Sequence, residues 1–448
     1  MEAHTGYEGC LHPDCSGDLC LLRLLTTQQN KQYAGALYAD RSSRTRSRPS
    51  RRRVVPRTPA LLMLLSVPLC RAQTAPDAHR IESPSRSPAA IQLSVRYLRR
   101  ACDESGRFAY LVDSDSGHLS RSYNIVRHAG AVYSLEMANR LRPDTATQDT
   151  IVRAGGYLWN NYVGPDANSD VLAVWTRPKP DSFEAELGAA GLGLVALTEI
   201  ERLRPNSMSL PDLRALGRFI LFMQKENGSF FSKYRIDSGP VAEIDSLYYP
   251  GEATLGLIAL YELDHSSGWL TAAGKALAFL ARSDGGGNIA PDHWDVIATA
   301  AFLPHYDQSS CAASRKQLIE HAERICERFL SEQITSGSDA AVISGFDPGG
   351  RTTPAATRLE ALLAALEFLP PEANALRGRI EIAVKRGVTF LLNAQITSGP
   401  YAGGMPATAI KPKSVVFRAD PKSSEIRIDY VQHALSAWLR YESIFGKK

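Results

Sequence analysis

Two groups of polar residues with the same spacing stand near opposite ends of the folded part of the sequence. They are Asn124, Arg127 and His128, and Asp429, Gln432 and His433. In each group the residues occupy positions i, i+3 and i+4 of a predicted helix, so they share one helix face. A histidine beside an amide, a carboxylate or a guanidinium is a side-chain set that can move protons on a bound polar substrate.

Each of these residues also has an ordinary structural explanation. Asn124 and Asp429 suit the N-cap of a helix. A histidine on an apolar helix is more often a packed core residue than a catalyst. However, Arg127 and His128 stand in an Ala-, Gly- and Leu-rich helix that should be buried, where a charge needs a partner. The repeated pattern therefore favours a shared polar site.

Further polar and aromatic residues stand near the starts of the other predicted helices of this kind, where a purely structural repeat needs only caps. Carboxylates, histidines and tyrosines can transfer protons on a sugar, and arginine or asparagine can neutralise a sugar carboxylate. The predicted proton-transfer residues are Glu252, Asp295, His128, His433, Tyr249 and Tyr430. The predicted substrate-binding residues are Asn124, Arg127, Arg358, Gln432, Asp429, His293, Trp175 and Trp294.

Two of the carboxylates have competing explanations. Glu252 follows Pro250-Gly251 in the first turn of a helix, where it equally well complements the helix dipole. Asp295 follows an ordinary helix start at Pro291-Asp292. Glu360 stands beside Arg358 on the fifth helix of this kind, and the sequence assigns it no role.

The helices that position these residues are predicted in six pairs. Apolar residues recur every three or four positions over 88–103, 146–162, 210–225, 268–282, 314–333 and 376–395. Each segment precedes a smaller, Ala-, Gly- and Leu-rich helix that begins near residue 123, 186, 250, 292, 354 or 429. Strand signals are confined to 413–417 and 425–428. This repeat predicts an all-α fold, an (α/α)6 toroid in which inner helices form a barrel and outer helices surround it.

The loops predict where a site would lie. Links from the second helix of one pair to the next pair are short, as at 142–145, whereas links within a pair are long, as at 163–185 and 397–427. The long links surround the N-termini of the inner helices, where unpaired N–H groups favour oxygen-rich ligands. In a closed ring the first and sixth inner helices are neighbours, so the two polar groups should face one cleft.

The predicted outer helices end in a shared motif. It reads Phe390-Leu391, Gln395, Gly399, Tyr401 in one copy, Phe219-Ile220, Gln224, Gly228, Phe230 in another, and Tyr97-Leu98, Cys102, Gly106, Phe108 in a third. This resembles the QW motif of the terpenoid-cyclase superfamily of α/α toroids, with Phe or Tyr in place of Trp. The resemblance implies the toroid fold and a structural role for the glutamine. It does not extend to the DxDD element of the triterpene cyclases, because Asp113-Ser114-Asp115-Ser116 lacks its last two acids.

The polar residues at the inner-helix starts are similar to those of six-hairpin glycosidases, α/α-toroid polysaccharide lyases and uronyl epimerases. The resemblance implies a carbohydrate-active enzyme that uses acid/base chemistry on a polysaccharide or oligosaccharide, by hydrolysis, elimination or epimerisation. No metal and no cofactor is expected. Two alternatives stay open: a terpenoid-cyclase-like enzyme with an aromatic, largely apolar cavity, and a non-catalytic binding or scaffold toroid whose polar residues pair among themselves.

The N-terminal part of the chain has a different character. Residues 1–53 lack a sustained apolar period and predict a disordered or misassigned extension. Residues 54–72 follow Arg51-Arg52-Arg53 with an apolar run and end in small residues, which is the order of a secretory signal peptide. Residues 73–87 are then a linker and 88–448 the toroid domain. The expected location is secreted or periplasmic, and a basic tail followed by a chance apolar run is the alternative.

Charge, hydropathy and cysteine content argue against several classes of binding partner. The 448 residues carry a net charge of +4, but the first 72 hold 11 Lys and Arg against 5 Asp and Glu, so the remainder is near neutral. Nucleic-acid binding is therefore disfavoured. No apolar run reaches the roughly 18–20 residues of a membrane span, so no stable membrane insertion is expected after signal cleavage. Cys102, Cys311 and Cys326 lack metal-ligand spacing and predict buried thiols.

Overall fold

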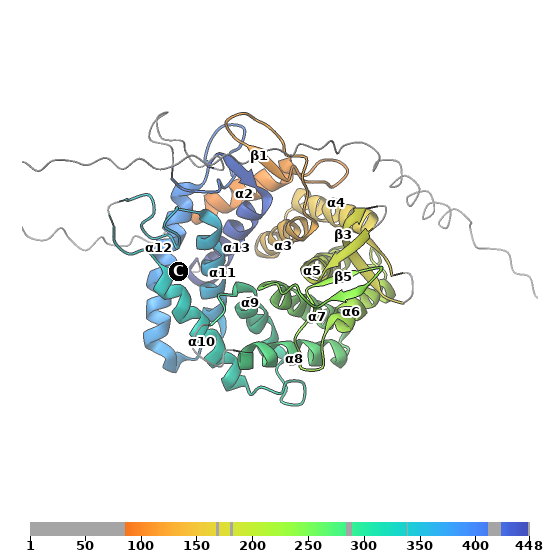
Figure 1. Cartoon of the computed structure of the whole chain (residues 1–448). Coiled ribbons are helices and arrows are strands. Elements are labelled where there is room, and N and C mark those ends of the chain that lie inside the picture. Colours follow the sequence, from red (N-terminus) through yellow and green to blue (C-terminus); the bar gives the residue numbers. More distant parts are fainter. Residues whose placement is uncertain are drawn as a thin grey trace, which may run out of the picture. The chain divides into compact units, whose positions relative to one another are not determined.

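Helices alternate between an outer and an inner ring (Figure 1). The computed structural model describes residues 86–166, 170–179, 182–283, 289–337, 339–410 and 423–446, and it contains twelve α-helices within these ranges. The outer helices are α2 (Ser87–Ala101), α4 (Thr145–Tyr162), α6 (Leu210–Met223), α8 (Ser267–Ser283), α10 (Arg315–Glu332) and α12 (Asn374–Ala394). The inner helices are α3 (Ile125–Leu141), α5 (Leu187–Leu203), α7 (Tyr249–Asp264), α9 (His293–Phe302), α11 (Thr352–Phe368) and α13 (Ile428–Phe445).

The inner helices form a closed ring. Each packs against the next inner helix along the chain, and α13 packs against α3. The prediction of an (α/α)6 toroid with six helix pairs is therefore confirmed, including the neighbourhood of the first and sixth inner helices. The predicted 1–53, 54–72 and most of 73–87 lie outside the described residues.

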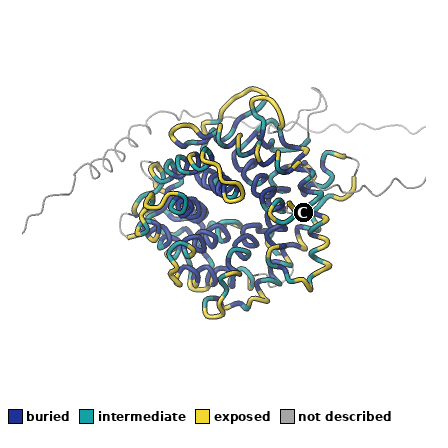
Figure 2. Tube along the Cα trace, turned by 180° about the vertical axis from the view of Figure 1, so that it is seen from behind, coloured by how far each residue is buried: buried dark blue, intermediate teal, exposed yellow. Residues whose placement is uncertain are grey.

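Composition explains which helices lie inside. In α5, 14 of 17 residues are buried, whereas in α6 only 7 of 14 are, because an inner helix is covered on all sides and an outer helix on one stripe. Figure 2 shows the same contrast between a buried inner ring and exposed loops and outer faces. Small residues permit the closest inner contacts: a Cβ on Gly191 would lie 2.4 Å from the carbonyl oxygen of Glu252 on α7.

Glutamine side chains tie neighbouring outer helices together. Each stands just after an outer helix and donates a hydrogen bond from Nε2 to a backbone carbonyl of the next outer helix. They are Gln224, Gln333 and Gln395, which bond the carbonyls of Ala272, Ala383 and Ala90 at 2.9, 2.9 and 3.0 Å. Two of them belong to the motif that the sequence identified, and Gln333 is an additional example.

The long loops contain more β-structure than the sequence predicts. An antiparallel five-stranded sheet has the order β2 (Val163–Pro165), β3 (Leu172–Lys179), β4 (Ser182–Glu186), β5 (Lys233–Arg235), β6 (Gly239–Val241). The sequence missed it because most of these strands have three residues, too few for a period to show. The expected strand near 425–428 is present as β7 (Glu425–Arg427), which pairs with β1 (Leu111–Asp113). The predicted strand at 413–417 lies outside the described residues.

Two further expectations concern burial and hydropathy. Cys102, Cys311 and Cys326 are buried, as predicted. Among the described residues, no helix combines the length and apolar character that crossing a membrane requires.

Candidate active site

The inner helices open into one large cavity at their N-terminal ends. It has a volume of about 1360 Å³, and segments 339–354 and 407–410 contribute to its wall. Of the fourteen residues that the sequence nominates, eleven line it: Asn124, Arg127, Tyr249, Glu252, His293, Trp294, Arg358, Asp429, Tyr430, Gln432 and His433. The helix starts thus bring together most of the predicted residues, as the loop lengths suggested.

His128 does not reach this cavity, which corrects the expectation from the repeated spacing. It is fully buried between α3 and α4, with Nε2 2.8 Å from the carbonyl oxygen of Ala154 and Nδ1 2.8 Å from the hydroxyl of Tyr123. A carbonyl only accepts, so Nε2 carries the proton and Nδ1 accepts from Tyr123. Burial lowers the pKa of His128 to about 4, so both nitrogens are occupied in a neutral ring.

Asp295 and Trp175 also lie away from the cavity lining. The Oδ2 atom of Asp295 is 2.6 Å from Nε2 of His321, so this carboxylate connects α9 to the outer helix α10. Trp175 lies on β3 in an aromatic cluster, with its ring centroid 6.1 Å from that of Tyr234. Sequence spacing could not detect either partner, because each comes from a segment far along the chain.

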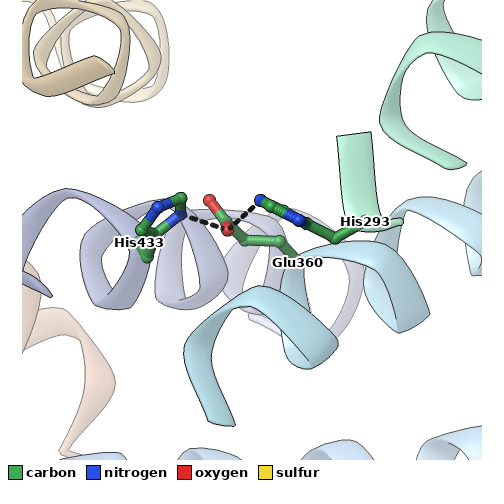
Figure 3. Close-up of side chains that lie close together, drawn as sticks. All are labelled: His293, Glu360 and His433. Atoms are coloured by element: carbon green, nitrogen blue, oxygen red, sulfur yellow. Dashed lines mark hydrogen bonds and ion pairs between the residues drawn. The ribbon is translucent and has the colours of Figure 1, made fainter. Parts of the chain in front are cut away.

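The centre of the candidate site is a carboxylate between two imidazoles (Figure 3). Glu360 of α11 is completely buried, and its Oε2 lies 2.7 Å from Nδ1 of His433 and 3.9 Å from Nε2 of His293. The sequence shows Glu360 among the polar residues of the fifth inner helix but does not nominate it, because no sequence pattern reveals the partners of a single buried acid. The carboxylate of Glu360 only accepts, so its 2.7 Å contact favours the tautomer of His433 that keeps the proton on Nδ1 and leaves the lone pair on Nε2, while the amide nitrogen of Gln432 lies farther from the same Nδ1, at 3.2 Å.

His293 has an unusual lack of polar contacts for a buried histidine. It is 2% exposed, and neither ring nitrogen has a hydrogen-bond partner among the described residues. Its neighbours are rings, with the centroid of Tyr248 at 5.1 Å and that of His433 at 5.4 Å. Burial, together with the nearby His433 and Arg358, lowers the pKa of His293 well below its usual value, so the ring is neutral at neutral pH.

Glu252 is a second buried carboxyl on the cavity wall. Its Oε2 has no hydrogen-bond partner among the described residues. Burial raises the pKa of Glu252 from 4.5 to about 8, and the nearby Glu186 adds to this while Arg127 opposes it. The carboxyl is therefore mostly protonated at neutral pH. Gly188 of α5 makes room for it, because a Cβ there would lie 2.1 Å from Oε2 of Glu252.

Arginine–aspartate pairs connect the two predicted polar groups. Arg127 of α3 lies 3.1 Å from Asp429 of α13 through its Nε. Arg427 holds the same carboxylate with two hydrogen bonds of 2.6 and 2.9 Å and also lies over the ring of Tyr430. A bidentate pair of this kind fixes orientation as well as charge. Arg358 is paired with Glu332 of α10 at 3.0 Å.

The site therefore offers groups for proton transfer and groups for orientation. His433 lines the cavity with its Nδ1 bonded to Glu360 and its Nε2 without a hydrogen bond to any described residue, and His293 supplies a second, neutral imidazole. The protonated Glu252 can donate a hydrogen bond to a substrate oxygen. One group could also hold a metal: ligand atoms of His293, Glu360 and His433 lie within 4.8 Å of one another, which the expectation of no metal site did not anticipate.

Sequence comparison does not place the chain in a family, since no protein-family model and no curated protein sequence matches it. Solved structures do resemble it. A cellobiose 2-epimerase from Bacillus thermoamylovorans has 14% identity and a TM-score of 0.58, and the match covers 81% of this chain and 99% of that one. A D-mannose isomerase has 10% identity and a TM-score of 0.60, covering 82% and 99%.

A GH76 α-mannanase from Bacteroides thetaiotaomicron also shares the arrangement, with 12% identity, a TM-score of 0.53 and coverage of 81% of this chain and 97% of that one. At such identities the likeness defines the fold, which is an (α/α)6 toroid of the kind found in these carbohydrate-active enzymes.

Proposed function

We propose that this protein is a sugar epimerase or isomerase that moves a proton next to the carbonyl group of an open-chain sugar. The observation that carries this proposal is the buried His433–Glu360–His293 arrangement on the wall of a polar cavity. Two imidazoles whose centroids lie 5.4 Å apart can serve neighbouring substrate atoms at one time. This is the requirement of enediol chemistry, in which one carbon and one oxygen exchange protons.

In the proposed reaction, Nε2 of His433 removes the proton from C2 of an aldose. The C2–H electron pair forms a C1–C2 double bond, and the carbonyl electrons move to O1, which takes a proton from His293. For the ketose, the imidazolium of His433 returns its proton to C1 of the enediol while O2 gives its proton to His293. For the epimer, the enediol turns its other face to His433, which protonates C2 while O1 returns its proton to His293. Glu360 stabilises the imidazolium formed on His433, and Glu252 donates a hydrogen bond to a substrate oxygen.

The structural relatives include both sugar epimerases or isomerases and mannanases, and the sequence favours the first reaction over hydrolysis. Two of them are a cellobiose 2-epimerase and a D-mannose isomerase. An α-1,6-mannanase of the same fold is described as inactive when two consecutive aspartates are replaced. No two aspartates are adjacent anywhere in the present 448 residues. A mannanase-type carboxylate pair is therefore missing from the sequence, whereas the two imidazoles are in place.

The cavity lining also bears on the two alternatives from the sequence. A terpenoid-cyclase-like site calls for an apolar lining, but Arg127, Glu252 and Asp429 line this cavity. In a scaffold the polar groups would pair off. The arginines do so, but His293 and Glu252 keep buried polar atoms without partners among the described residues. Such atoms are costly to bury unless a ligand satisfies them.

Exchange of hydrogen with solvent tests the proposal. The protein is incubated in heavy water with cellobiose, D-mannose or D-glucose in the presence of a chelator, and the C2 proton is followed by NMR. We expect deuterium at C2 together with an epimer or ketose. His433→Ala and His293→Ala should abolish it, while His118→Ala, at an exposed loop position, should not. Release of new reducing ends, or of unsaturated uronate, without C2 exchange would overturn the proposal in favour of hydrolysis or elimination.

We also propose that the enzyme is exported through the segment at 54–72. The support is its order of arginines, apolar run and small residues. Expression of the full chain followed by N-terminal sequencing tests this. A mature N-terminus near residue 73 outside the cytoplasm is expected, and an intact cytoplasmic chain would contradict the proposal.

A further inference from the structure

We propose that His293, Glu360 and His433 form a binding site for a divalent transition-metal ion such as Zn²⁺, and that the ion inhibits the enzyme. The binding site stands on geometry alone, whereas the inhibition rests on the proposed function. The three residues come from α9, α11 and α13, so their convergence is a product of the closed ring. Two imidazoles and one carboxylate form a ligand set that Zn²⁺ accepts readily.

The separations between ligand atoms are close to those of a metal site. Metal–ligand bonds of about 2.0–2.2 Å at tetrahedral angles place ligand atoms about 3.3–3.6 Å apart. Oε2 of Glu360 lies 2.7 Å from Nδ1 of His433 and 3.9 Å from Nε2 of His293. One distance is shorter and the other longer than required, so small side-chain rotations would suffice. The fourth position would face the cavity, because His293 and His433 both line it.

Unsatisfied polar atoms provide an independent reason to expect a ligand. Both nitrogens of His293 and the Oε1 atom of Glu360 are buried without a hydrogen-bond partner among the described residues. A bound cation would accept the lone pair of His293 and balance the charge of Glu360. Tyr248 and Trp294 contact the ring of His293. The amide nitrogen of Gln432 lies 3.2 Å from Nδ1 of His433, and Arg358 is the nearby positive charge.

The tautomer of His433 explains why the ion would inhibit. Catalysis needs the proton on Nδ1 and the lone pair on Nε2, which is the state that Glu360 favours. A metal ion on Nδ1 displaces that proton. A neutral ring then carries its proton on Nε2, so the nitrogen that should accept the substrate proton is blocked. The same ion also occupies the lone pair of His293.

Direct metal binding is the first part of the test. The full chain is stripped with a chelator and titrated with Zn²⁺ against a chromogenic chelator at neutral pH. Cys10, Cys15 and Cys20 can also bind Zn²⁺. The result is therefore the difference between the number of Zn²⁺ ions bound by the parent and by each variant. We expect one equivalent, weakened on the order of 100-fold by His433→Ala and by Glu360→Gln.

A matched control separates this site from surface binding. His305 lies 3.2 Å from Glu262 in an exposed pair, so His305→Ala removes a histidine–carboxylate contact outside the cavity and should leave the equivalent intact. Binding of Co²⁺ gives a second measurement. The difference between the visible spectra of the parent and of a cavity variant should lack the charge-transfer band of a thiolate ligand. An equivalent that persists in both cavity variants, or that carries the thiolate band, overturns the site.

The second part measures C2 exchange with and without one equivalent of Zn²⁺. Loss of exchange on adding Zn²⁺, restored by chelator, supports inhibition. Unchanged exchange with the site filled overturns the inhibitory part while the site stands. If no sugar exchanges even with chelator present, the proposed function fails, and the titration still decides whether the metal site exists.

Discussion

His128 and His433 have the same sequence context and opposite environments. Each stands four residues after an acid or amide and begins an Ala- and Leu-containing inner helix. His128 is sealed between α3 and α4 with both nitrogens hydrogen-bonded. His433 lines the cavity and bonds the buried carboxylate of Glu360. The first histidine has both nitrogens satisfied within the protein, whereas the second belongs to the cavity wall.

The starting point of each helix contributes to this difference. α3 begins one residue after Asn124, whereas α13 begins one residue before Asp429. His128 is therefore the fourth residue of its helix and His433 the sixth. At about 100° per residue, two positions rotate the side chain by roughly 200° relative to the helix start. Equal spacing along a sequence thus does not guarantee equal orientation in a ring.

The largest expected effect on the rate comes from removing the cavity histidine. We expect His433→Ala to lower the rate of C2 exchange per folded molecule by about 10²–10⁴-fold, the usual range for general acid–base catalysis, and to lower the free energy of unfolding by about 1–3 kcal/mol because Glu360 loses its hydrogen-bond partner. Steady-state exchange by NMR and urea unfolding measure the two quantities. A variant that unfolds readily but keeps its rate per folded molecule would show that His433 is structural.

His128→Ala should lower the stability of the fold and leave the rate of C2 exchange nearly unchanged. It removes a buried ring and leaves Tyr123 and the carbonyl of Ala154 without a partner, so we expect a loss of about 2–4 kcal/mol in the free energy of unfolding. Exchange per folded molecule should stay within about threefold of the parent. A large fall in rate with unchanged unfolding would mean that His128 takes part in the chemistry.

The structural role of His128 should also appear in how the free energy of unfolding depends on pH. The pKa of His128 is lowered to about 4 from an ordinary 6.5, so the folded state resists a proton that the unfolded chain accepts. Its stabilising contribution is complete above pH 6.5 and is lost as the pH falls towards 4, by up to about 3 kcal/mol at 1.4 kcal/mol per pKa unit. Urea unfolding of the parent and of His128→Gln should show this loss in the parent only. Equal slopes in both proteins would contradict it.

Glu360→Gln probes the partner that distinguishes the two histidines. The amide can still accept from Nδ1 of His433 but carries no charge to stabilise an imidazolium, so we expect a 10–100-fold lower rate of C2 exchange. Glu367→Gln on the same helix is the control, since Glu367 pairs with Arg440 outside the cavity lining. An exchange rate per folded molecule equal to that of the parent would mean that Glu360 only packs against His433.

Periodicity predicted the fold well because the signal repeats six times. The apolar spacing of each outer helix and the small residues of each inner helix are local properties, and the closure of α3 on α13 follows from counting six pairs. The five-stranded sheet escaped detection because its strands are short and pair across long loops. Eleven of the fourteen nominated residues reached the cavity because inner-helix starts converge in any such ring.

The ring and the polar helix starts around its cavity can be predicted from local spacing and loop length. The hydrogen-bond partners of the polar side chains depend on how the helices pack. His128 is hydrogen-bonded to the carbonyl of Ala154, Asp295 to His321, and His433 to Glu360. Each partner lies at least 26 residues away along the chain, so the helical period carries no record of it. These hydrogen bonds form only when the helices pack together, and they distinguish a histidine satisfied in the core from one that lines the cavity.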